Sequence, residues 1–77
     1  MTNNGDYKTT LQQLVEKDGS ATLEYEVVAE NGPEHDKTFT VVVKVNNNVV
    51  GEGTATTKKD AEQQAAKLAL VLFGIIL

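Results

Sequence analysis

The sequence predicts an α+β fold, a two-layer sandwich in which two helices cover one face of a three-stranded antiparallel sheet, in the order α-β-β-β-α. Three observations support this prediction. Apolar residues recur at helical spacing near both ends of the chain, apolar and polar residues alternate in its middle, and segments rich in Asn, Gly and Pro separate the alternating runs. At 77 residues the chain has room for one small core.

The first helix is expected in the segment DYKTTLQQLVEKDG. Its apolar stripe, at positions i, i+4, i+7 and i+8, consists of Tyr7, Leu11, Leu14 and Val15. Asp6 can cap the free N–H groups of the first turn, and Gly19 can follow the end of the helix.

Three strands are expected next. In LEYEVVAENG the residues of the buried face are Leu23, Tyr25, Val27 and Ala29, and in KTFTVVVKV they are Phe39, Val41, Val43 and Val45. The opposite face, with Glu24, Glu26, Thr40 and Lys44, is expected to remain in water. The run NNN can form a left-handed hairpin turn. In the third strand, VVGEGTA, Gly51 and Gly53 allow a bend or the close approach of another backbone.

The second helix is expected to start after Thr57, which is a good N-cap residue, and Asp60 can complete a capping box with it. The apolar stripe expected to face the sheet consists of Ala61, Ala65, Leu68, Ala69, Leu72 and Phe73. We therefore expect a polar leader at residues 1–5, one domain at residues 6–73 and a short apolar tail at residues 74–77.

The composition limits the classes of function. Seven lysines, no arginine and eleven acidic residues give a formal charge of -4, which argues against binding of polyanions through bulk charge. The absence of cysteine fits a reducing compartment, and we expect a cytoplasmic protein. MTNNGD lacks the basic start and apolar stretch of a signal peptide, and LALVLFGIIL is about half as long as a membrane span, so no membrane contact is expected.

Lys58 and Lys59 fall in the first turn of the second helix, where the helix dipole and the free N–H groups disfavour a cation. One interpretation is that they are two solvated surface lysines, partly offset by Asp60 and Glu62. The other is a phosphate site, because a helix N-terminus presents N–H groups and positive potential to which two ammonium groups add charge.

Two further segments carry polar groups that suit the recognition of hydroxyls. Thr9, Gln12, Gln13 and Glu16 recur at i, i+3, i+4 and i+7 and form one stripe on the exposed side of the first helix. In NGPEHD, Gly32 and Pro33 shape a protruding loop, and His35 lies near its tip. Taken alone, each of these features is more often an ordinary solvated surface.

The order and spacing of these segments resemble the double-stranded RNA-binding domain, most closely the domain at the C-terminus of bacterial ribonuclease III. DYKTTLQQLV is similar to the opening helix of the family, YEVVAENGPEHDKTF to its strand and GP-x-H loop, and VVGEGTATTKKDAEQQAA to its G-x-G segment followed by KK-x-A-E-Q-x-A-A. The resemblance extends from about Asp6 to Leu72 and implies the same α-β-β-β-α fold.

The resemblance implies a module that binds double-stranded RNA by its A-form shape, with little sequence specificity, by touching two minor grooves and the phosphates between them. The residues carried over by motif are Thr9, Gln12 and Gln13, with Glu16 beside them, for one minor groove, Gly32, Pro33 and His35 for the next, and Lys58 and Lys59 for the phosphates. Glu16 stands where many relatives carry an amide, and Glu62 replaces a third basic residue. We therefore expect modest affinity with strong salt dependence.

We expect a binding module and not an enzyme. The acidic signature of ribonuclease III, of the type E-x-x-E-F-L-G-D, is absent, and one histidine without any cysteine offers no nucleophilic set. No cofactor, metal or small-molecule substrate is expected. Both an excised ribonuclease III domain and a free-standing module fit the sequence, and we favour the first. The alternative function is a protein-interaction or dimerisation module that has weakened or lost RNA binding, in line with the acidic balance and the apolar end FGIIL.

Overall fold

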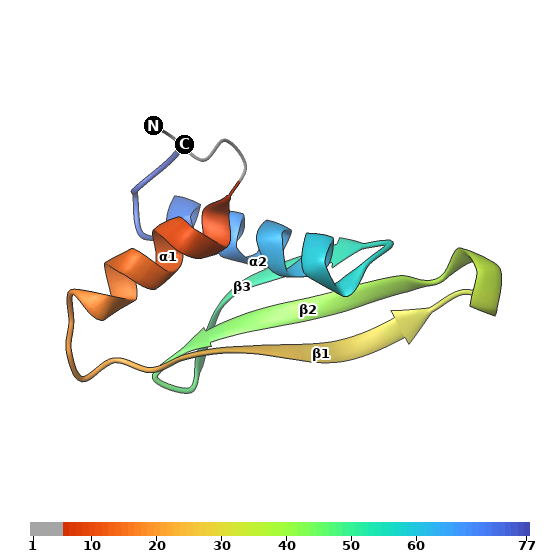
Figure 1. Ribbon diagram of the computed structural model, residues 1–77, viewed down its shortest axis with the longest axis horizontal. Coiled ribbons are helices and arrows are strands. Elements are labelled where there is room, and N and C mark those ends of the chain that lie inside the picture. Colours follow the sequence, from red (N-terminus) through yellow and green to blue (C-terminus); the bar gives the residue numbers. More distant parts are fainter. Residues whose placement is uncertain (1–5) are drawn as a thin grey trace.

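The computed structural model describes residues 6–77, so the expected leader at residues 1–5 lies outside the described residues. The elements in chain order are α1 (Tyr7–Glu16), β1 (Leu23–Asn31), η1 (Glu34–Asp36), β2 (Thr38–Val45), β3 (Asn48–Ala55) and α2 (Lys58–Leu72). The strands form one antiparallel sheet in the order β1-β2-β3, and both helices lie on the same side of it (Figure 1). The predicted α+β sandwich is therefore confirmed.

The first helix begins after Asp6, as its apolar stripe and its N-cap residue predicted. The Asp6 carboxylate accepts a hydrogen bond from the Thr9 backbone N–H at 3.3 Å, as expected of an N-cap. Leu11 and Val15 are buried in the core, and Tyr7 and Leu14 pack partly buried against it.

The hairpin between β2 and β3 uses the asparagine run as predicted. Asn46 and Asn47 have φ angles of 52° and 68°, and the flanking residues Val45 and Asn48 pair across the strands. Two consecutive left-handed residues make a type I′ turn, whose twist matches that of the strands.

The alternation predicted for β1 holds at its start and fails in its middle. Leu23 and Tyr25 are half-buried, but Val27 is 36% exposed, so its assignment to the buried face was wrong. The pairing of β1 with β2 is irregular between Val27 and Ala29. In addition, α2 packs mainly on β3 and β2, which leaves the middle of the edge strand β1 uncovered.

A bend or a close backbone approach was predicted at the two glycines of β3, and the structure shows the close approach. A Cβ atom on Gly51 would overlap the carbonyl oxygen of Ala65, and one on Gly53 would overlap that of Ala61. The backbones of β3 and α2 therefore lie directly against each other, which only glycine permits on the strand side.

This close approach changes which side chains of α2 are buried. The buried residues are Ala61, Ala65, Ala66, Ala69 and Leu70. Leu68, Leu72 and Phe73 are 49%, 65% and 42% exposed, so their assignment to the buried stripe was wrong. The small alanines fit against the glycines of β3, and Ala66 and Leu70 join the core cluster that includes Leu11 of α1.

The end of α2 turns back onto the core. Gly74 has a φ of 77°, its N–H donates to the Val71 carbonyl, and the Ile75 N–H donates to the Leu70 carbonyl at 2.9 Å. This pattern is a Schellman cap, and it brings Ile76 against the core. Within residues 6–77 no helix is long and apolar enough to cross a membrane.

Candidate nucleic-acid interface

The polar stripe predicted on α1 exists as one surface. Thr9, Gln12, Gln13 and Glu16 line a shallow depression together with Lys8 and Tyr25. Gln12, Gln13 and Glu16 are exposed, whereas Thr9 is half-buried and its hydroxyl donates to the Asp6 carboxylate at 2.7 Å. The Thr9 oxygen can still accept a hydrogen bond from a ligand.

The Glu16 carboxylate is hydrogen-bonded to the side-chain amide of Gln12 on this stripe. Gln12 Nε2 donates to Glu16 Oε2 at 2.9 Å, one helical turn apart. The carboxylate thus takes one of the two N–H donors of an amide that the resemblance assigns to ligand binding, as the i, i+4 spacing of the two residues allows.

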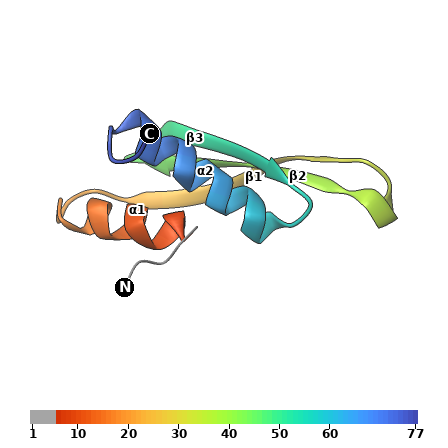
Figure 2. The same cartoon turned by 90° about the horizontal axis from the view of Figure 1, so that it is seen from above.

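The loop between β1 and β2 is held in a defined shape. Gly32 has a φ of 93°, which favours glycine, and the Asp36 N–H donates to the Pro33 carbonyl at 2.9 Å. Lys37 braces the loop through ion pairs with Glu30 and Glu34 at 3.5 and 3.1 Å. The loop lies where β1 and β2 extend beyond the helices, a shape visible from two directions (Figures 1 and 2).

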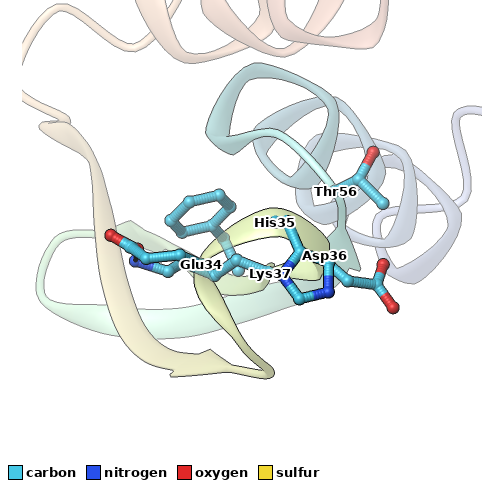
Figure 3. Close-up of a pocket in the computed structure, with 6 residues that line it drawn as sticks. Glu34, His35, Asp36, Lys37 and Thr56 are labelled. Atoms are coloured by element: carbon cyan, nitrogen blue, oxygen red, sulfur yellow. Dashed lines mark ion pairs between the residues drawn. The ribbon is translucent and has the colours of Figure 1, made fainter.

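His35 is exposed and lines a cleft between this loop and the segment before α2. The other residues that line the cleft are Glu34, Asp36, Lys37, Phe39 and Thr56 (Figure 3). The structure therefore brings Gly32, Pro33 and His35 together in one loop, and this loop approaches the segment that leads into the lysine pair.

Lys58 and Lys59 are exposed on the first turn of a capped helix. Thr57 Oγ1 accepts from the Asp60 N–H at 3.0 Å, although among residues 6–77 no return bond from the Asp60 carboxylate completes the predicted capping box. Three other lysines form ion pairs, namely Lys8, Lys37 and Lys44. Within the described part of the chain Lys58 and Lys59 form none, so both ammonium groups are available to an anion.

The start of α1 is tied to the start of α2 by a single amide side chain. Gln63 Oε1 accepts from the backbone N–H groups of Tyr7 and Lys8 at 2.8 and 3.2 Å, and Gln63 Nε2 donates to the Asp6 carboxylate at 3.2 Å. Next to it, Glu62 forms an ion pair with Lys8. These contacts fix the α1 stripe relative to the lysine pair, and sequence reasoning missed them because their partners lie more than 50 residues apart.

Two ionisable side chains near the contact of α1 with α2, Asp6 and Tyr25, have shifted pKa values. Hydrogen bonds from the Thr9 side chain and then from Gln63 lower the pKa of Asp6. Burial, and to a smaller extent the charge of Glu62, raises the pKa of Tyr25 to about 12. The Tyr25 hydroxyl is buried and has no hydrogen-bond partner within residues 6–77.

The outer face of the sheet is acidic. Glu26 and Glu52 flank Val42 across the three strands, and Glu24 is exposed on the same face. Lys44, paired with Glu26 at 2.6 Å, has a raised pKa because of that hydrogen bond. A polyanion is therefore disfavoured on this face, and the candidate interface is the opposite, helical side together with the loop.

Comparisons with known proteins show which family the chain is similar to. Residues 7–71 match the family described as the double-stranded RNA binding motif. The chain is 55% identical over 65 residues to Ribonuclease 3 of Bdellovibrio bacteriovorus and 49% identical to that of Natranaerobius thermophilus, in each case over 84% of this chain and 28% of the relative. The chain thus spans little more than a quarter of these ribonucleases.

Solved structures give the same picture. Dicer from Pichia stipitis matches with a TM-score of 0.71 and 31% identity, over 92% of this chain and 34% of that one. The second dsRBD of DRB4 matches with a TM-score of 0.65 and 38% identity, over 88% of this chain and 94% of that one.

Proposed function

This chain belongs to the family of double-stranded RNA-binding domains, and from that membership we propose that it binds RNA duplexes by their A-form shape, with little sequence specificity. Its 77 residues are a binding module. The observation that carries the proposal is the lysine pair, which stands on a capped helix N-terminus without any ion-pair partner among residues 6–77. An uncompensated pair of cations at this place is disfavoured in the free domain and favoured beside a phosphate.

In the proposed complex, Lys58 and Lys59 bind phosphates on either side of the major groove. The stripe of Thr9, Gln12, Gln13 and Glu16 faces one minor groove, where amide and hydroxyl groups meet ribose 2′-hydroxyls. The loop of Gly32, Pro33 and His35 enters the next minor groove. This arrangement uses the shallow minor groove of A-form RNA, which displays those hydroxyls.

The proposal extends to the protein that contains the module. The relatives named above are ribonucleases, so we propose that residues 6–73 serve as the substrate-binding domain of a cytoplasmic ribonuclease III, engaged in RNA processing. The catalytic domain of such a protein would be the partner in the same chain, and residues 74–77 would form a short apolar tail.

The test is a titration of an RNA duplex of about 20 base pairs, which exceeds the roughly 16 base pairs that such domains span. The wild type is compared with a Lys58→Ala/Lys59→Ala variant. We expect the variant to lose most of its affinity and the slope of log K against log salt to fall by about 2.

The matched control is Lys44→Ala/Lys67→Ala, which removes the same net charge from the outer sheet face and from a later turn of α2. Equal loss of affinity in both double variants would show that bulk charge, and not the lysine pair, binds the RNA.

An alternative function is supported by the exposed apolar side chains at the end of α2. Leu68, Leu72 and Phe73 are at least 42% exposed. This surface fits a protein-interaction or dimerisation module. That role predicts a molecular mass that rises with concentration, together with RNA affinity that does not change when Lys58 and Lys59 are replaced.

A further inference from the structure

We propose that Phe39 is a positioning residue of the RNA interface, which holds the ammonium group of Lys58 in place for a phosphate. The inference rests on the proposed function and deepens it. It starts from a contact between the central strand β2 and the first turn of α2 that no sequence pattern indicates.

The contact is a cation–π pair. Lys58 Nζ lies 5.5 Å from the centroid of the Phe39 ring, inside the distance of about 6 Å at which an aromatic face attracts an ammonium group. Within residues 6–77 no carboxylate is paired with Lys58, so the ring is the group that holds this cation.

The local sequence explains why the ring is there. Phe39 lies opposite Ala55 in the pairing of β2 with β3, and the small side chain of Ala55 leaves space on this face of the sheet. The chain then passes through Thr56 and Thr57 and begins α2, so Lys58 returns over the strand that carries Phe39.

The same ring also reaches the loop. Phe39 lines the cleft that contains His35 and Thr56 (Figure 3). One side chain is thus shared by the loop proposed for a minor groove and by the lysine proposed for the phosphates. A long lysine side chain that is already held loses less rotamer freedom on binding, which favours affinity.

The experiment is a double-mutant cycle with an RNA duplex of about 20 base pairs. Phe39→Leu keeps an apolar side chain and removes the ring, and we expect it to weaken binding about fivefold, because the freed Lys58 side chain must then be ordered when RNA binds. In a Lys58→Met background we expect Phe39→Leu to change affinity by less than about twofold, because the group it positions is gone.

Two variants serve as controls. Phe39→Tyr retains an aromatic face and should bind like the wild type. Phe73→Leu removes the other, exposed phenylalanine and should leave affinity unchanged. A second readout, independent of RNA, is the NMR shift of the Lys58 ε-methylene protons, which the ring moves to lower frequency in the wild type but not in Phe39→Leu.

The outcomes separate the two proposals. If the wild type does not bind RNA, the proposed function fails, whereas the methylene shift still reports on the Phe39–Lys58 contact. If the wild type binds and Phe39→Leu weakens binding equally in both backgrounds, or the shift is absent in the wild type, the positioning role is refuted.

Discussion

Glu16 accepts a 2.9 Å hydrogen bond from Gln12 Nε2, so one of the two N–H groups of that amide is occupied and only the other can donate to a ribose hydroxyl. The carboxylate also places negative charge against the minor groove of a polyanion in the proposed complex. At the scale of single residues, Glu16 therefore disfavours RNA binding by the α1 stripe. This agrees with the modest affinity expected from the sequence.

We predict that Glu16→Gln raises affinity for an RNA duplex about two- to tenfold, because it removes the charge and supplies a second donor. The measurement is a fluorescence-anisotropy titration at fixed salt. Glu52→Gln, which makes the same charge change on the outer face of the sheet, should leave affinity nearly unchanged. Unchanged or weaker binding by Glu16→Gln would contradict the opposing role.

The Tyr25 hydroxyl is buried and has no hydrogen-bond partner among residues 6–77. We predict that Tyr25→Phe raises the free energy of unfolding by about 1 kcal/mol, since it removes an unsatisfied polar group and keeps the ring that lies 5.0 Å from the Lys8 ammonium. Urea denaturation at neutral pH measures the difference, and a clear loss of stability would show that the hydroxyl has a partner.

The raised pKa of Tyr25 makes stability depend on alkaline pH. The unfolded chain releases this proton near the ordinary pKa of 10.0, whereas the folded domain keeps it up to about 12. Between these values the unfolded state binds fewer protons, so wild-type stability should fall as pH rises. Denaturation at pH 8 and pH 11 should show a smaller fall for Tyr25→Phe, and an equal fall in both proteins would exclude Tyr25 as the cause.

At the scale of elements, periodicity predicted that α2 exists and where it begins, but not which side it buries. Leu68 and Leu72 satisfy a helical repeat as well as Ala66 and Leu70 do, so the local pattern cannot choose between them. The choice is made by the contact of the alanines of α2 with the glycines of β3, which requires both elements to be in place. The caps at Asp6 and Thr57 depend on neighbouring residues only, and they were predictable.

This contact gives a prediction for the packing of α2. A methyl group on Gly53 would overlap the Ala61 carbonyl oxygen and lie 2.6 Å from the Ala65 nitrogen. Gly53→Ala should therefore lower the free energy of unfolding by about 1 to 3 kcal/mol. Gly19→Ala is the control, because nothing lies within 4 Å of its added Cβ atom. Wild-type stability in Gly53→Ala would mean that α2 lies farther from β3.

At the scale of the whole molecule, charge is divided between the two faces of the sheet. The outer face carries Glu24, Glu26 and Glu52. Lys58 and Lys59, which form no ion pair within residues 6–77, lie at the start of a helix on the other side. A net charge of -4 is therefore compatible with a local site for a polyanion. The resemblance to the family predicted this site from its residues, but the contacts of Gln63 with α1 and of Phe39 with Lys58 have no local signature in the sequence.

RNA binding by this domain is best tested through its affinity for an RNA duplex of about 20 base pairs and for the DNA duplex of the same sequence, at low and at physiological salt. We expect RNA to bind with an affinity that falls with salt. We expect DNA to bind at least about tenfold more weakly, because it lacks the 2′-hydroxyl and the A-form groove. Equal affinity for both duplexes, or no binding of RNA even at low salt, would contradict the proposed function.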